Sequence, residues 1–245
     1  MRYPLVIVAV LVSSCGDSGS PTQPVAPPPA ATPTGIVIQD GAGRLTEHHA
    51  LIRMLVEQTL AQASAALGID PGSVAITVTG DASRSIAGYG VGGFAPNGRA
   101  IEIHINPDFP DLETILRERV PLTVAHELHH ATRWRGPGYG STLLEWMISE
   151  GLADHFAVEL LGVPLPPWSR AFPESETSAF LAQARPELDS TRFDSGAWFF
   201  GTRADLPRWT GYTLGYRLVE NYQAANPGSS AADLVNTPAD AFRPA

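Results

Sequence analysis

The chain has only one cysteine, so no disulfide can form within it. It is also short of positive charge, with 16 Lys and Arg against 25 Asp and Glu. The resulting net charge of −9 argues against nucleic acid as a partner, because neutralising phosphates requires a basic surface. After the N-terminus there is no apolar run of the roughly 18 residues expected of a membrane-spanning helix. A hydrophobic content of 44% nevertheless predicts a globular protein.

The N-terminal residues have the features of a lipoprotein signal peptide. Arg2 provides a small positive region, and residues 4–12 form an apolar core that is too short to span a bilayer. Residues 11–15, which end in Ser14 and Cys15, resemble a bacterial lipobox, in which the chain is cleaved just before a cysteine that receives lipid. The alternative is that Cys15 is an incidental thiol. We expect residues 1–14 to be the signal peptide of an extracytoplasmic lipoprotein that is anchored to the membrane through Cys15.

The composition changes sharply at the end of this segment. Residues 15–35 are dominated by Pro, Ser, Thr, Ala and Gly, with almost nothing apolar to bury, which predicts an extended, lipid-anchored linker. From there to the C-terminus the apolar residues recur in periodic patterns. We therefore expect one folded domain over residues 36–245.

Within this domain, strand patterns precede helix patterns. Helical periodicity covers residues 46–67, and alternation predicts strands at 74–78 and 100–106. The Gly-rich residues 88–93 lack the Lys-Ser/Thr of a phosphate loop and favour a hairpin. Further helices are expected at 112–120, 121–133, 141–161, 174–184 and 210–225, with Pro121 in the first turn of its helix. This order indicates an α+β fold.

A histidine motif in the helix expected at 121–133 carries the chemistry. His126 and His130 lie four residues apart and therefore share a helix face, so both imidazoles can bind one zinc ion. Glu127 is rotated by about 100° from His126, which places its carboxylate beside the metal, where a general base must stand. A His126–His129 pair is also geometrically possible, but only the His126–His130 pair leaves Glu127 in the position of the base.

The next helix offers the third ligand that a catalytic zinc site requires. Glu150 is followed one turn later by Asp154, which can accept the second N–H of a ligand histidine. Gly151 and Ala153 are small, which predicts a close approach of this helix to the histidine helix. The alternative, that Glu150 and Asp154 are solvated surface charges, loses weight beside the histidine motif.

Together these motifs resemble those of the gluzincin metalloproteases, of which thermolysin is a familiar member. The chain resembles still more closely a bacterial family of predicted Zn-dependent proteases related to YjaZ, over about residues 85–225. Supporting similarities are Gly92-Gly93-Phe94, the strand at 101–106, and Gly211-Tyr212 with Gly215-Tyr216. The resemblance implies one zinc ion per chain on His126, His130 and Glu150, with Glu127 as base and Asp154 hydrogen-bonded behind the ligands.

The resemblance also implies a zincin-like fold. Its small N-terminal mixed sheet would have an edge strand packed on the active-site helix, followed by a mainly helical C-terminal lobe. In zincins the edge strand pairs with extended substrate, and the strand at 100–106 is expected to fill this place. His104 on that strand is expected to be a surface histidine, although it could contact substrate, and His155 is expected to face solvent or to serve in packing.

Two tyrosines in the last helix are candidates for stabilising an oxyanion. Tyr212 and Tyr216 lie one turn apart, and either hydroxyl could point at the carbonyl oxygen of a substrate. We favour Tyr212, because Gly211 and Gly215 are expected to leave room around it, although both rings could instead be packing residues.

The sequence thus predicts a zinc metallopeptidase that cleaves extracytoplasmic proteins or peptides with Glu127 as general base. Two other functions stay open at this point. One is a catalytically silent lipoprotein with a zincin fold that acts as a binding module. The other is a metal-dependent hydrolase of a non-peptide amide or ester.

Overall fold

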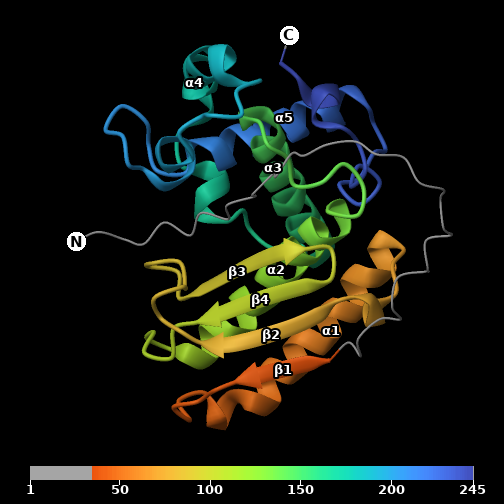
Figure 1. Ribbon diagram of the computed structural model, residues 1–245, viewed down its shortest axis with the longest axis vertical. Coiled ribbons are helices and arrows are strands. Elements are labelled where there is room, and N and C mark those ends of the chain that lie inside the picture. Colours follow the sequence, from red (N-terminus) through yellow and green to blue (C-terminus); the bar gives the residue numbers. More distant parts are fainter. Residues whose placement is uncertain (1–34, 245) are drawn as a thin grey trace, which may run out of the picture. The chain divides into compact units, whose positions relative to one another are not determined.

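The computed structural model describes residues 35–244, so the predicted signal peptide, Cys15 and all but the last residue of the predicted linker lie outside this range. Four strands form one sheet in the order β1-β2-β4-β3 (Figure 1). β1, β2 and β4 run parallel, whereas β3 is antiparallel to β4. The strands are β1 (Ile36–Gln39), β2 (Ala75–Gly80), β3 (Val91–Asn97) and β4 (Ala100–Ile105). The predicted small mixed sheet is confirmed.

Alternating side chains give the sheet one apolar face. In β4, Ile101, Ile103 and Ile105 are buried, while Glu102 between them is partly exposed. The Gly-rich stretch leads into the β3–β4 hairpin, as the sequence predicted. β1 was not predicted, because its four residues are too short to show a clear alternation.

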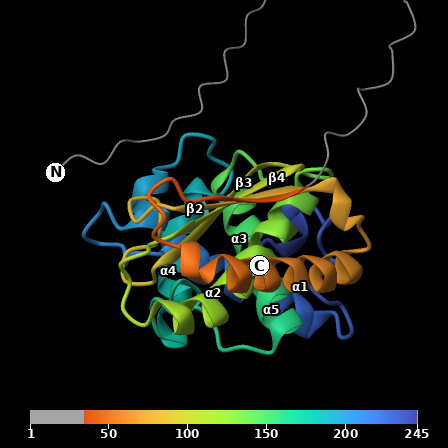
Figure 2. The ribbon, with the colours of Figure 1, turned by 90° about the horizontal axis from the view of Figure 1, so that it is seen from below.

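Two long helices, α1 (His49–Leu67) and α2 (Leu112–Arg133), cover the apolar face of the sheet (Figure 2). The predicted stripe of α1 is largely buried there, with Ile52, Val56 and Ala63 fully inaccessible. α1 also packs along α2, which carries the histidine motif.

α2 corrects a prediction about Pro121. The sequence predicted two helices with a break before Pro121, but one continuous helix contains this proline in its interior. Proline removes one helical hydrogen bond and costs about 3 kcal/mol. Here the flanking Val120 and Leu122 are both buried in the core, and their burial offsets that cost. The continuous helix ties the histidine motif rigidly to the sheet.

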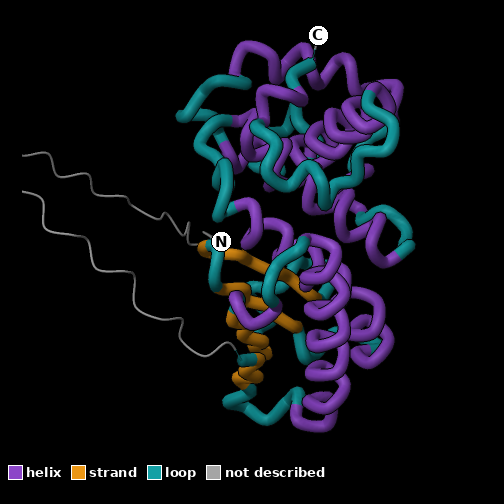
Figure 3. Tube along the Cα trace, turned by 90° about the vertical axis from the view of Figure 1, so that its right-hand side faces the viewer, coloured by secondary structure: helices purple, strands orange, loops and turns teal. Residues whose placement is uncertain are grey.

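The chain after α2 forms a mainly helical lobe, as predicted (Figure 3). This lobe has a second hydrophobic core. Thr142 and Glu145 form a capping box at the start of α3, so this helix begins at residue 143 rather than 141. The helices are α3 (Leu143–Leu161), α4 (Thr177–Ala184), α5 (Thr210–Ala225) and a π-helical turn (Gly196–Phe200). Short 3₁₀ turns lie at Thr46–His48, Pro71–Ser73, Pro167–Arg170, Glu174–Glu176, Arg185–Glu187 and Ala239–Phe242.

The prediction of the edge strand was wrong in one respect. β4 lies inside the sheet between β2 and β3, so it is β3 that forms the edge beside α2. The local pattern of a strand reveals which face is buried but not which neighbours it pairs with, and this is why the order was missed. Within residues 35–244 no helix combines the length and apolar character needed to cross a membrane.

Candidate metal centre

The histidine motif of α2 presents two buried imidazoles at one point. His126 and His130 lie one turn apart with their rings packed edge to face, and their Nε2 atoms lie 2.9 Å from each other. Both side chains are almost completely shielded from solvent. Two ring nitrogens at this distance form the start of a metal-binding cluster.

α3 brings Glu150 to the same point. Its Oε2 atom lies 3.1 Å from Nε2 of His126 and 3.4 Å from Nε2 of His130. A tetrahedral zinc ion with bonds of about 2.0–2.1 Å would separate its ligand atoms by about 3.3 Å. The three separations are close to this value, so the cluster of His126, His130 and Glu150 is compatible with zinc.

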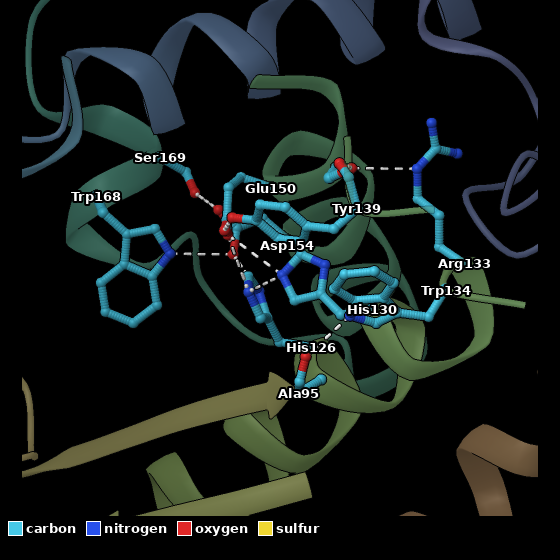
Figure 4. Close-up of polar contacts among 11 residues, drawn as sticks. Ala95, His126, His130, Arg133, Trp134, Tyr139, Glu150, Asp154, Trp168 and Ser169 are labelled. Carbon is cyan, nitrogen blue, oxygen red and sulfur yellow. Dashed lines mark hydrogen bonds and ion pairs between the residues drawn. The ribbon is translucent and has the colours of Figure 1, made fainter. Parts of the chain in front are cut away.

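Asp154, one turn beyond Glu150 on α3, forms a hydrogen bond with the ring nitrogen of His126 that faces away from the cluster (Figure 4). Its Oδ1 atom accepts the Nδ1–H of His126 at 2.8 Å, which leaves the lone pair on Nε2 facing the cluster. Trp168 Nε1 donates to the same Oδ1 atom at 3.0 Å, and Ser169 Oγ donates to Oδ2 at 2.6 Å. The orientation of His126 is therefore fixed by a carboxylate that is itself held by two donors.

The electrostatics of the cluster favour a cation. Burial raises the pKa of Glu150, but the two imidazoles outweigh burial and hold this pKa far below its usual value. Burial likewise lowers the pKa of His126, and the Asp154 and Glu150 carboxylates outweigh it and raise this pKa well above the usual value. Glu150 Oε2 has no hydrogen-bond donor among the described residues, although it is buried. A divalent ion would satisfy this buried acceptor and the two histidine lone pairs together.

Glu127 lies next to the cluster without contributing an atom to it. Its side chain is 6% exposed and makes no hydrogen bond within residues 35–244. Burial raises the pKa of this carboxyl, and the two imidazoles partly oppose the rise. The edge strand β3 leaves space for it, because a Cβ atom on Gly93 would lie 2.6 Å from both Cγ and Oε1 of Glu127. The Glu127 carboxylate thus lies beside the cluster without a hydrogen-bond partner among the described residues.

Tyr139 was missed by the sequence analysis. It lies in the loop between α2 and α3, where its hydroxyl donates a short hydrogen bond to Oε1 of Glu150. Its ring packs on His130, with the ring centroids 5.1 Å apart. A single tyrosine in a loop gives no periodic signal, so only the structure reveals that it contacts two residues of the cluster. The roles of Trp168 and Ser169 were missed for the same reason.

The two candidate tyrosines of α5 differ in their surroundings. Tyr212 is partly buried, and burial together with the Glu150, Asp154 and Glu127 carboxylates raises its pKa well above the usual value. Tyr216 instead stacks on His155, with the ring centroids 3.7 Å apart. Of the two, Tyr212 is the one whose pKa the Glu150 and Glu127 carboxylates raise. The packing role expected for His155 is confirmed.

The glycines of α3 and α5 serve a different contact from the one predicted. A Cβ atom on Gly151 would lie 2.3 Å from the carbonyl oxygen of Gly215, and one on Gly215 would lie 1.9 Å from that of Met147. Gly151 thus permits close packing of α3 on α5, not on α2. A Cβ atom on Gly211 would meet the Phe199 ring at 2.6 Å, so neither Gly211 nor Gly215 leaves open room around Tyr212.

The remaining histidines lie away from the cluster. His129 is buried on another side of α2, with its Nε2 atom 3.3 Å from the carbonyl oxygen of Ala231 and its ring near Phe156. It is therefore not paired with His126 in the cluster. His104 was expected at the surface but is 3% exposed. Glu102, on the same face of β4, lies 3.5 Å from it.

A comparison with family models finds one match over residues 74–243, to the family described as predicted Zn-dependent protease (DUF2268). No curated protein and no solved structure matches the chain. The matched region includes the whole of α2 and α3, and with them every residue of the cluster. The chain belongs to this family of predicted Zn-dependent proteases.

Proposed function

We propose that the protein is a zinc-dependent peptidase in which His126, His130 and Glu150 hold one zinc ion and Glu127 is the general base. The observation that carries the proposal is the buried cluster of His126, His130 and Glu150, in which Glu150 Oε2 has no hydrogen-bond donor among the described residues. The buried carboxyl of Glu127, whose pKa is raised, lies beside this cluster. A structural zinc site is usually closed by four protein ligands, whereas three ligands leave a position for water or substrate. The family description supports the same conclusion.

The residues around the cluster have separate tasks in this proposal. When bound, zinc polarises a carbonyl group and lowers the pKa of a water molecule. Glu127 accepts a proton from the attacking water and passes it to the nitrogen of the departing amine. Tyr212 donates a hydrogen bond to the carbonyl oxygen as negative charge develops on it. Asp154 keeps the proton of His126 on Nδ1 throughout.

The edge of β3 supports an extended peptide as the substrate. The carbonyl of Val91 accepts from the Ile86 N–H, and that of Ala95 accepts from Trp134 Nε1, so both carbonyls point away from β4. Because backbone direction alternates along a strand, the N–H and carbonyl of Gly93 point to this same edge. Gly93 also lies against Glu127, so a peptide that pairs with it would pass the cluster.

The zincin-like fold and the cellular location belong to this proposal as well. The mixed sheet beside the histidine helix and the helical lobe that carries Glu150 support a zincin-like fold. Lipidation of Cys15 would hold the domain on the outer side of a membrane, where its substrates would be extracytoplasmic proteins or peptides.

Exchange of Glu127 for glutamine tests the proposal. Glu127→Gln keeps the size of the side chain but removes its basicity, so zinc content and melting temperature should change little. The rate of cleavage of unfolded protein substrates, followed by mass, should fall by roughly 10²–10⁴-fold. Glu118→Gln, an exposed change on the same helix, is the matched control.

Three outcomes are informative. Loss of cleavage in Glu127→Gln alone supports the proposal. Equal cleavage by wild type and an equally zinc-loaded Glu127→Gln variant would show that Glu127 is not the base. A wild type that binds zinc but cleaves no peptide would favour the silent binding module, and hydrolysis of esters alone would favour the non-peptide hydrolase.

A further inference from the structure

Tyr139 engages the cluster at two points at once. Its hydroxyl donates to Oε1 of Glu150, while the other oxygen of this carboxylate faces the two histidines. Its ring covers the ring of His130. A carboxylate with one oxygen held in this way keeps its second oxygen directed at the metal position, so that it is not free to rotate.

The ring of Tyr139 is clamped by two tryptophans. Trp134 stacks on it at a centroid distance of 6.3 Å, and Trp146 packs edge-on at 5.2 Å. Each tryptophan is itself fixed by its indole N–H, which donates to the carbonyl of Ala95 in one case and of Gly140 in the other. The ring therefore has little freedom to turn its hydroxyl away from Glu150.

The backbone of Tyr139 is held by a chain of buried polar contacts. Ser149 Oγ donates to the Tyr139 carbonyl oxygen at 2.6 Å and accepts from Arg133 Nε at 3.2 Å. Arg133 Nη1 also donates to the carbonyl oxygens of Val235 and Thr237, each at 2.9 Å. Arg133 is 2% exposed and forms no ion pair within residues 35–244. Arg133 thus donates to neutral acceptors on α3 and in the C-terminal segment.

Two glycines let the loop adopt this path. Gly138 and Gly140, on either side of Tyr139, have φ angles of 88° and 112°, a region that other residues rarely adopt. These two glycines permit the backbone path that presents Tyr139 to the cluster.

From these contacts we infer that Tyr139 is a positioning residue for the metal centre: it locks Glu150 as the third ligand and is itself locked by Ser149 and Arg133. This inference rests on the zinc site of the proposed function. It assigns to the loop between α2 and α3 a share of the metal affinity, although no atom of that loop belongs to the cluster.

The first test is the affinity of the full chain for zinc, measured by competition with a chromophoric chelator. Tyr139→Phe keeps the ring contacts and removes only the hydroxyl. Loss of such a partner of a metal ligand typically weakens metal binding by about 10–100-fold. Tyr222→Phe, which alters a tyrosine packed on Phe242 in the C-terminal part of α5, should stay within about twofold of wild type. Zinc affinity of Tyr139→Phe equal to that of wild type would overturn the inference.

A double-mutant cycle separates positioning from a general structural effect. If Tyr139 acts through Glu150, then adding Tyr139→Phe to Glu150→Ala should weaken zinc binding by no more than about twofold, because the group that it positions is absent. An undiminished effect in that background would contradict the inference. The visible spectrum of the cobalt-substituted Tyr139→Phe protein gives a further readout, and it should differ from that of wild type if the carboxylate is no longer held.

Failure of the proposed function gives a different result. A wild type that binds zinc tightly but cleaves nothing leaves the zinc affinities of the Tyr139 variants fully interpretable. A wild type that binds no zinc overturns both the metal centre and the role of Tyr139.

Discussion

Replacing Gly93 by alanine should damage catalysis without removing the metal. The added Cβ atom would lie 2.6 Å from Cγ and Oε1 of Glu127 and 2.7 Å from Cγ2 of Thr123. Ordinary contact begins at 3.4 Å, so the Glu127 side chain must withdraw by about 0.8 Å. These three atoms are the nearest to the new Cβ, and none of them belongs to His126, His130 or Glu150.

The size of the effect follows from this displacement. A catalytic group moved by about 1 Å costs roughly 10²-fold in rate, and overpacking costs about 1–3 kcal/mol of stability. We therefore expect Gly93→Ala to keep its zinc, to unfold at somewhat lower urea concentration, and to lose about two orders of magnitude in kcat/KM on a peptide substrate.

Gly92→Ala is the matched control for this prediction. Gly92 precedes Gly93 in β3 but faces the other side, where a Cβ atom would lie 2.8 Å from the backbone carbonyl oxygen of Arg84. Its stability should fall, while turnover per folded molecule should not. If Gly93→Ala turned over at the rate of wild type, or if both variants lost activity equally, the argument that Gly93 makes room for the base would be refuted.

Three further predictions concern the ligand support, pH and the anchor. Asp154→Asn should weaken zinc binding by about 10–100-fold in chelator competition, whereas Glu159→Gln, which changes a carboxylate of α3 outside the cluster, should not. Burial raises the pKa of Tyr216 to about 12, so the stability that its proton contributes is present below pH 10 and is lost as the pH rises through 12. Between pH 10 and 12 the free energy of unfolding should therefore fall by up to about 3 kcal/mol less in Tyr216→Phe than in wild type. If urea titrations gave the same pH dependence for both proteins, this cause would be contradicted. Cys15→Ala should abolish partitioning of the protein with membranes, and unchanged partitioning would refute the lipid anchor.

The cluster could be predicted from the sequence because its residues lie on helices. A separation of four residues puts His126 and His130 on one face whatever the rest of the fold, and the same rule aligns Glu150 with Asp154. Since one helix turn is a local property, no knowledge of tertiary structure was needed to see that these side chains could converge.

The surroundings of the cluster could not be predicted in this way. Tyr139 reaches Glu150 from a loop whose path depends on Gly138 and Gly140, and Trp168 and Ser169 reach Asp154 from a 3₁₀ turn. Such contacts depend on how elements pack and not on periodicity.

The order of the strands and the burial of His104 could not be predicted for a similar reason. Alternation places His104 opposite the buried isoleucines of β4, but it does not reveal that β3 pairs beside β4 and takes the edge. The small size of Gly151 correctly predicted a close contact between helices. The helix that approaches α3 at this position is α5 rather than the predicted α2, and this depends on tertiary packing.

Anomalous diffraction at the zinc edge, from crystals of the protein grown with zinc, tests directly whether His126, His130 and Glu150 hold a zinc ion. We expect one peak within about 2.0–2.2 Å of Nε2 of His126, Nε2 of His130 and a carboxylate oxygen of Glu150. A zinc peak at other residues, or no peak between these three side chains in the presence of zinc, would contradict it.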